Sequence, residues 1–135
     1  MLRYLLDTNI CIFTIKNKPP HLRSLFNTHA TQICVSQVTV MELYYGAYRS
    51  QQVERNLSVI EGFIARLPVI PYDAHAADHT AQIRAELASR GTPIGPYDAM
   101  IAGNARSQGL IVVTNNTREF SRVEGLRVED WLERT

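Results

Sequence analysis

Three acidic residues are the strongest candidates for chemistry, because each stands alone in an apolar part of the sequence. Asp7 follows the apolar run of LRYLL, Glu42 lies within VMELYY and Asp98 lies within YDAMIAG. Glu42 is the only carboxylate between Asp7 and Glu54, and Asp98 is isolated in the same way. An ionised carboxylate in apolar surroundings is unstable unless a cation or hydrogen bonds compensate its charge. We therefore expect a partner for each of these acids.

The elements that must position these acids follow from the hydrophobic pattern. Apolar runs predict strands at residues 2–6, 33–35, 69–72 and 110–113, with a last strand near 126–128. Other patterns predict helices at residues 9–17, 36–49, 53–66, 74–90 and 99–108, with a further helix starting at Pro19-Pro20. Apolar strands that alternate with helices are typical of a parallel sheet covered on both faces. The sequence therefore predicts an α/β fold.

This topology brings the three acids to one edge of the sheet. Asp7 ends the first strand, Glu42 lies in the first two turns of the helix after the second strand, and Asp98 lies in the first turn of a later helix. Thr114 leaves the carboxyl end of the fourth strand. In an open parallel sheet such points share the edge where ligands bind. Helix N-termini offset part of the negative charge there, and the rest favours Mg²⁺, or Mn²⁺, held by a few carboxylates plus a substrate phosphate.

Structural roles for single acids compete with the metal site. Asp7 is also placed to cap a helix after the strand, and Asp98 is placed to interact with the dipole of its own helix. Glu42 fits such a role less well, since no basic residue follows it before Arg49. The joint arrangement of all three favours the metal site.

Length and composition limit the other possibilities. The 135 residues are 45% hydrophobic and 20% charged, which is typical of one globular domain over residues 1–135. The formal net charge is +1, so bulk charge gives no argument for nucleic-acid binding. Cys11 and Cys34 lack metal-ligand spacing and are expected to be reduced and buried. Asp7 interrupts the N-terminal apolar run, and no run reaches the roughly 18–20 residues of a membrane span. We expect a cytoplasmic protein.

Other catalytic motifs are missing from the sequence. There is no GxGxxG, no GxxxxGK followed by Ser or Thr, and no GxSxG. His75 and His79 are four residues apart, but Ala76 stands where a zinc protease carries Glu. These absences argue against dinucleotide, P-loop and nucleophilic enzymes.

Four motifs follow one another along nearly the whole chain. They are LLDTNI at residues 5–10, MELYYG at 41–46, GTPIGPYDAMIA at 91–102 and TNNTREF at 114–120, the last followed by GLRVEDW at 125–131. In this order and at these separations they resemble the motifs of PIN domains, specifically of VapC-type toxin ribonucleases from bacterial toxin–antitoxin pairs. The resemblance implies a three-layer α/β/α PIN-like fold with a central, mostly parallel sheet of four to five strands.

The resemblance also implies roles for the acids. Asp7, Glu42 and Asp98 match the catalytic acids, and Asp7 and Asp98 are expected to bind the metal directly. Many PIN domains carry Asp at the position of Asn116, so this chain departs from the pattern there. Glu119, one helical turn later, is the candidate fourth acid. Whether Asn116 or Glu119 completes the site stays open at the level of sequence.

Thr8 and Thr114 are expected to support the site by hydrogen bonding, with capping after a strand as the alternative role. Metal ions would orient water for in-line attack on a phosphodiester, which predicts products with a 5′-phosphate and a 3′-hydroxyl. A nuclease that uses the ribose 2′-hydroxyl would usually need a pair of His residues, and none is suitably placed.

The resemblance implies that the substrate is RNA. A structured RNA such as tRNA, cut in the anticodon loop, is expected, with initiator tRNA favoured. Arg84, Arg90 and Arg118 are candidates for contacts with RNA phosphates. A solvated helix face, with Glu86 paired to Arg90, is the alternative for these arginines.

The resemblance implies two protein partners, a VapB-like antitoxin and a second copy of the chain in a homodimer. Two other classes of function compete with the nuclease. One is a non-catalytic RNA-binding PIN-like module, which the intact acids at all three positions argue against. The other is a metal-dependent phosphohydrolase of small molecules, which would need a nucleotide-binding loop that the sequence lacks.

Overall fold

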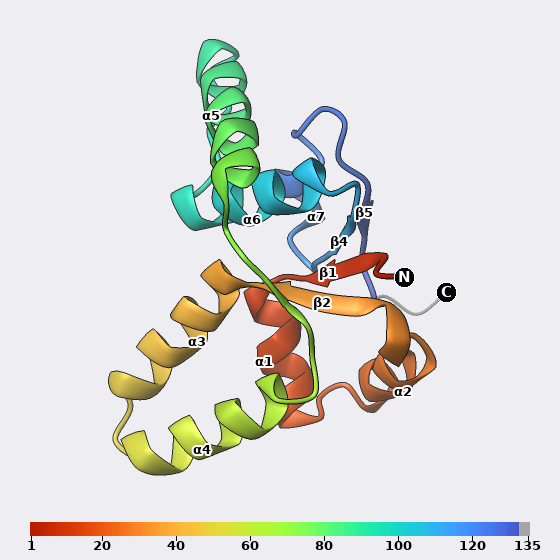
Figure 1. Cartoon of the computed structure of the whole chain (residues 1–135), viewed down its shortest axis with the longest axis vertical. Coiled ribbons are helices and arrows are strands. Elements are labelled where there is room, and N and C mark those ends of the chain that lie inside the picture. Colours follow the sequence, from red (N-terminus) through yellow and green to blue (C-terminus); the bar gives the residue numbers. More distant parts are fainter. Residues whose placement is uncertain (133–135) are drawn as a thin grey trace.

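A parallel sheet forms the centre of the computed structural model, which describes residues 1–132 (Figure 1). Within those residues five strands lie in the order β3-β2-β1-β4-β5, and every neighbouring pair is parallel. The strands are β1 (Tyr4–Leu6), β2 (Ile33–Ser36), β3 (Val69–Ile70), β4 (Ile111–Val113) and β5 (Val128–Glu129). The chain therefore has the predicted α/β fold, with β1 in the middle of the sheet.

Helices cover both faces of this sheet. One face carries α1 (Thr8–Lys16), α2 (Pro20–Thr28), α3 (Gln37–Tyr48) and α4 (Val53–Ile64), with a short 3₁₀ turn at Ala30–Gln32 (Figure 1). The other face carries α5 (Ala74–Ser89), α6 (Pro96–Ser107) and the short α7 (Thr117–Phe120). The predicted three layers are confirmed. Among residues 1–132, no helix is both long enough and apolar enough to cross a membrane.

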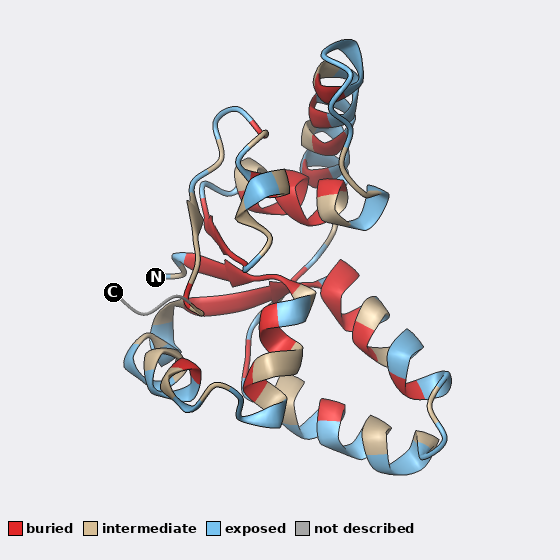
Figure 2. Cartoon of the chain, turned by 180° about the vertical axis from the view of Figure 1, so that it is seen from behind, coloured by how far each residue is buried: buried red, intermediate tan, exposed pale blue. Residues whose placement is uncertain are grey.

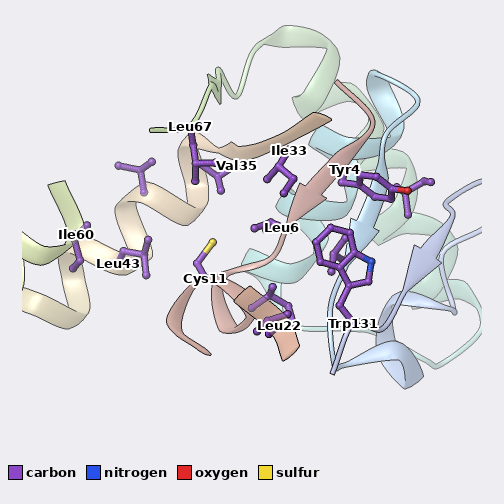
Figure 3. Close-up of a cluster of buried hydrophobic side chains, with 14 of the residues drawn as sticks. Tyr4, Leu6, Cys11, Leu22, Ile33, Val35, Leu43, Ile60, Leu67 and Trp131 are labelled. Atoms are coloured by element: carbon purple, nitrogen blue, oxygen red, sulfur yellow. The ribbon is translucent and has the colours of Figure 1, made fainter. Parts of the chain in front are cut away.

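Alternating side chains of each strand supply two separate cores, because successive residues of a strand point to opposite faces. Tyr4 and Leu6 of β1 pack with α1, α3 and α4, whereas Leu5 between them packs with α5 and α6. Figure 2 shows that the central strands are buried throughout. Figure 3 shows the first core, in which the rings of Tyr4 and Trp131 lie 5.1 Å apart. Trp131 thereby holds the segment after β5 against the middle of the sheet.

Several element boundaries differ from the predicted ones for local reasons. α6 begins at Pro96 rather than 99, since proline is well suited to the first position of a helix. β3 ends at Ile70, because Pro71 has no N–H to continue the ladder. The last strand lies at Val128–Glu129 instead of 126–128, and α7 was not predicted. Cys11 and Cys34 are buried and free, as expected.

The crossing of α5 and α6 depends on a glycine. A Cβ atom built on Gly103 would lie 2.7 Å from the backbone nitrogen of Thr80 and 2.9 Å from its Cα. We expect Gly103→Ala to lower the free energy of unfolding by about 1–3 kcal/mol, because the two helices must move apart. Urea unfolding of the purified variant measures this change.

Gly62, in the exposed part of α4, provides the matched control. A Cβ atom there would meet nothing within 4 Å. Gly62→Ala should leave the protein as stable as wild type or stabilise it by about 0.5–1 kcal/mol, since alanine favours a helix more than glycine does. A Gly103→Ala protein as stable as wild type would show that α5 and α6 are not packed as closely as described.

Candidate active site

Asp7 lies at the carboxyl end of β1 and is also the N-cap of α1. The backbone N–H of Ile10 donates to its Oδ1 at 2.9 Å, and the hydroxyl of Thr114 donates to its Oδ2. The side chain is buried, with 3% exposed. Burial raises the pKa of Asp7 to about 6, which the hydrogen bonds from Thr114 and Ile10 oppose and the charge of Glu42 reinforces. Asp7 therefore caps α1 and also lies close to the other acids of the candidate site.

Glu42 is half-buried on α3, where Thr8 at the start of α1 holds it. The Thr8 hydroxyl donates to Glu42 Oε1 at 2.7 Å and lies 3.2 Å from the hydroxyl of Thr39. The predicted support by Thr8 is present in this geometry. The side chain of Thr8 therefore ties α3 to α1 at the carboxyl edge of the sheet.

A buried polar bridge fixes the start of α3 relative to α6. Ser36 is the N-cap of α3, and its hydroxyl accepts from the backbone N–H of Val38 at 3.0 Å. The same hydroxyl donates to Asn104 Oδ1 at 2.6 Å, and Asn104 Nδ2 donates to the carbonyl of Pro71 at 3.1 Å. Ser36 was predicted from the sequence as a helix N-cap, whereas its hydrogen bond to Asn104 was not predicted. The available signal was a single amide among the small residues of DAMIAGNA.

Asp98 lies in the first turn of α6, as predicted, and is half-buried. Its pKa is raised to about 6, first by burial and then by the charges of Asp7, Glu119 and Glu42, with a hydrogen bond to Glu119 adding to the effect. The charges of all three other candidate acids therefore raise the pKa of Asp98. The structure thus brings together Asp7, Glu42, Asp98 and the candidate fourth acid, Glu119.

Thr114, Asn116 and Glu119 form the remaining side of the acid cluster. The Thr114 hydroxyl accepts from the backbone N–H of Asn116 at 2.9 Å while it donates to Asp7. The side-chain amide of Asn116 donates to Glu119 Oε2 at 2.9 Å. In this structure the carboxylate at 119, held by the amide at 116, is the side chain that reaches Asp98.

The acid cluster, defined as Asp7, Glu42, Asp98 and Glu119, has no basic partner in the described chain. Within residues 1–132 the ion pairs all belong to Arg90. Among the same residues, no three His, Cys, Asp or Glu side chains are arranged as a ready-made metal site. Mg²⁺ usually keeps several waters and binds through one or two carboxylates. An all-oxygen donor set with uncompensated charge fits such an ion, and Asp7 and Asp98 are the residues that would hold it.

The three arginines predicted to contact RNA have different surroundings. Arg90, at the C-terminal end of α5, pairs with Glu86 at 2.6 Å and with Glu124 at 3.3 Å. The pairing with Glu86 is the alternative to RNA contact that the sequence offered for this residue. The guanidinium of Arg90 is therefore paired with acids that do not belong to the candidate site. Arg84 is exposed on α5 and lines a small pocket of its own. Arg118, exposed on α7 next to Glu119, stays a prediction as an RNA contact.

An apolar groove opens beside the acid cluster, between α1, α3 and α4. Its volume is about 280 Å³, and Glu42 forms part of its wall. The other residues that line it are Ile12, Ile15, Lys16, Leu43, Gly46, Ala47, Asn56, Val59 and Ile60. The groove was not predicted from the sequence, because it arises from the packing of three helices and no local pattern marks it.

Known proteins that are similar to this chain belong to the class of protein that its fold and acid cluster indicate. The family model described as "PIN domain" matches residues 4–126, so the chain belongs to the PIN-domain family. The tRNA(fMet)-specific endonuclease VapC of Shigella flexneri is 66% identical over 131 residues, 97% of this chain and 99% of that protein. Ribonuclease VapC2 of Haemophilus influenzae is 52% identical over 132 residues, 98% of this chain and 100% of that protein.

Solved structures support the same relationship. The DNA-bound VapBC complex of Salmonella typhimurium contains a chain with 63% sequence identity and a TM-score of 0.93, covering 97% of this chain and 99% of that one. VapBC2 of Rickettsia felis, bound to a DNA fragment from its promoter, matches with 33% identity and a TM-score of 0.90 over 96% of this chain and 99% of that one. The relatives described here are thus VapC ribonucleases and VapBC complexes.

Proposed function

We propose that this chain is a Mg²⁺-dependent endoribonuclease toxin that hydrolyses phosphodiester bonds of tRNA, with initiator tRNA as the favoured substrate. The observation that carries the proposal is the cluster of four carboxylates at the carboxyl edge of the sheet, which lacks a basic partner within residues 1–132. The relative that is 66% identical is a tRNA(fMet)-specific endonuclease, which supports the choice of substrate.

The roles of the side chains follow from how each is held. Asp7 and Asp98 would bind the ion, since both carboxyls have raised pKa values that a cation would lower again. When bound, Mg²⁺ supplies positive charge that stabilises the developing phosphorane and acidifies water. Thr8 orients Glu42 and Asn116 orients Glu119, so these two carboxylates would accept hydrogen bonds from the attacking water. The expected products carry a 5′-phosphate and a 3′-hydroxyl.

Incubation of the purified protein with total RNA tests this function. Reactions contain Mg²⁺ or EDTA, and the ends of the products are sequenced. We expect cleavage with Mg²⁺ alone, concentrated in the anticodon loop of initiator tRNA, with elongator tRNAs as matched controls in the same reaction. Binding of RNA without cleavage would support the non-catalytic PIN-like module instead. Cleavage that persists in EDTA would remove the metal from the mechanism.

We also propose that a VapB-like antitoxin binds and inhibits the chain, and that two copies of the chain form a homodimer within that complex. The two solved relatives described above are VapBC assemblies. The apolar groove ends at Glu42, so an apolar segment with an Arg or Lys would fill the groove and place its cation on the acids. Such a cation competes with Mg²⁺ for the same carboxylates.

Co-expression with the product of the neighbouring open reading frame checks the antitoxin. We expect the two proteins to co-purify and growth arrest to be relieved. Val59, whose side chain is 46% exposed in the groove, gives the variant: Val59→Asp should reduce co-purification at least tenfold, because a charge would be buried against the apolar segment. The control is Ser58→Asp, at an exposed neighbouring position outside the groove. A neighbouring product that neither co-purifies nor relieves arrest would contradict the assignment.

A further inference from the structure

Asn116 is linked to two members of the acid cluster, directly to Glu119 and through the hydroxyl of Thr114 to Asp7. Its backbone N–H donates to the hydroxyl of Thr114 at 2.9 Å, and that hydroxyl donates to Asp7 Oδ2. Its side-chain Nδ2 donates to Glu119 Oε2 at 2.9 Å. A continuous path of hydrogen bonds therefore connects Asp7 at the end of β1 with Glu119 on α7. Residue 116 is the middle of that path.

Glu119 needs such a contact to keep one orientation. Its side chain has three rotatable bonds, and α7 is only four residues long. No Lys or Arg within residues 1–132 forms an ion pair with it. A hydrogen bond from an amide N–H to a carboxylate is short and directional, so the Asn116 amide limits the rotation of the carboxyl group.

We propose that Asn116 is a positioning residue: its amide holds Glu119 as the fourth acid of the site. The proposal rests on the proposed function. Asn116 Nδ2 donates to Glu119 and its backbone N–H donates to Thr114, so both of its nitrogens hold side chains of the site in place. The amide at 116 and the acid at 119 act as one unit, and the amide has no effect of its own when the acid is absent.

A double-mutant cycle tests this dependence. The four proteins are wild type, Asn116→Ala, Glu119→Ala and the double variant, with Asn115→Ala at the exposed neighbouring amide as the matched control. The first readout is binding of Mn²⁺ alone, followed by loss of the electron paramagnetic resonance signal of the free ion. The second is kcat and KM for cleavage of tRNA in Mg²⁺. Thermal melts of all five proteins establish that they are folded.

We expect Asn116→Ala to weaken Mn²⁺ binding and to lower kcat by about 10- to 100-fold, a typical effect for a residue that orients a metal-site ligand, with KM unchanged. On the Glu119→Ala background the same substitution should change neither quantity further. Asn115→Ala should behave as wild type. Equal losses with and without Glu119 would show that Asn116 acts on the ion itself and would overturn the proposal. Wild-type values for Asn116→Ala would overturn it as well.

Asn116→Leu gives a second, isosteric comparison. Leucine keeps the shape of the side chain but has no N–H to donate to Glu119, so we expect a loss at least as large as that of Asn116→Ala. Wild-type Mn²⁺ binding and kcat in this variant would overturn the proposal, because the donor would then be unnecessary. The Mn²⁺ measurement does not require cleavage. If wild type fails to cleave RNA, the proposed function fails, while the cycle in Mn²⁺ affinity still decides the role of Asn116.

Discussion

Asp7→Asn, Glu42→Gln and Asp98→Asn should each lower the rate of RNA cleavage by about 100-fold or more while the protein stays folded. The size of the loss follows from the contribution that positioned acids and bases make to catalysis. Each substitution keeps the shape of the side chain and removes one negative charge from the acid cluster. In the Asp7→Asn protein the amide oxygen can still cap α1 by accepting from the backbone N–H of Ile10, so the fold should survive. The measurement is single-turnover cleavage of initiator tRNA in Mg²⁺.

Two acids outside the cluster serve as controls. Asp73 caps α5 by accepting from the backbone N–H of Ala76, and asparagine can do the same. Asp78 is exposed on α5, where it accepts from Gln82 at 3.2 Å. Asp73→Asn and Asp78→Asn should cleave RNA as wild type does. Near-wild-type turnover by the Asp7 or Asp98 variant would remove the proposed site.

The fold was predictable because its strands are short, apolar and separated by clear helical patterns. Leu5 and Leu6 illustrate this: both are fully buried, on opposite faces of β1, which is possible only in a sheet covered on both sides. The positions of Asp7 and Asp98 followed from topology, since the ends of parallel strands share one edge. Element order was therefore enough to gather acids that are 91 residues apart in sequence.

Features that depend on packing between distant segments were not predictable in the same way. The bond from Ser36 to Asn104 joins residues 68 positions apart, and no local pattern marks such a pair. The choice between Asn116 and Glu119 also depended on side-chain direction, which periodicity does not determine. The alternative role of Arg90 in a salt bridge with Glu86 was visible from their i, i+4 spacing, whereas its second partner, Glu124, was not.

The metal-free protein should lose stability as the pH rises from about 4 to about 6. Asp7 and Asp98 both have pKa values of about 6 in the folded protein, above the ordinary aspartate value of 3.8. The folded state therefore binds more protons than the unfolded state in this window, so the free energy of unfolding falls with rising pH and levels off above it. For the buried Asp7 the shift corresponds to about 3 kcal/mol at neutral pH. Urea unfolding in EDTA at several pH values measures the slope.

Mg²⁺ should restore part of this stability through the same carboxylates. An ion that binds only the folded state adds RT ln(1 + [L]/Kd), which is about 1.4 kcal/mol at ten times Kd. For a domain of this size we expect the melting temperature to rise by roughly 4–8 °C. Asp98→Asn should lose most of that rise. The metal-free Asp98→Asn protein should melt at a slightly higher temperature than metal-free wild type at pH 7. The substitution removes a partly buried carboxylate that the other acids of the cluster repel.

Thermal melts of wild type and Asp98→Asn, each in Mg²⁺ and in EDTA at matched ionic strength, test both parts of this expectation. Matching the ionic strength keeps screening constant, so a difference between the two conditions reports specific binding. Below about pH 3 the metal-free wild type and Asp98→Asn should converge in stability, since the carboxyl at 98 is then protonated in the folded and unfolded states alike. An equal response to Mg²⁺ in the two proteins would mean that the ion binds elsewhere. Asp98 would then be a half-buried acid without a metal, and its carboxyl group, with a pKa of about 6, would be left with the role of a proton donor.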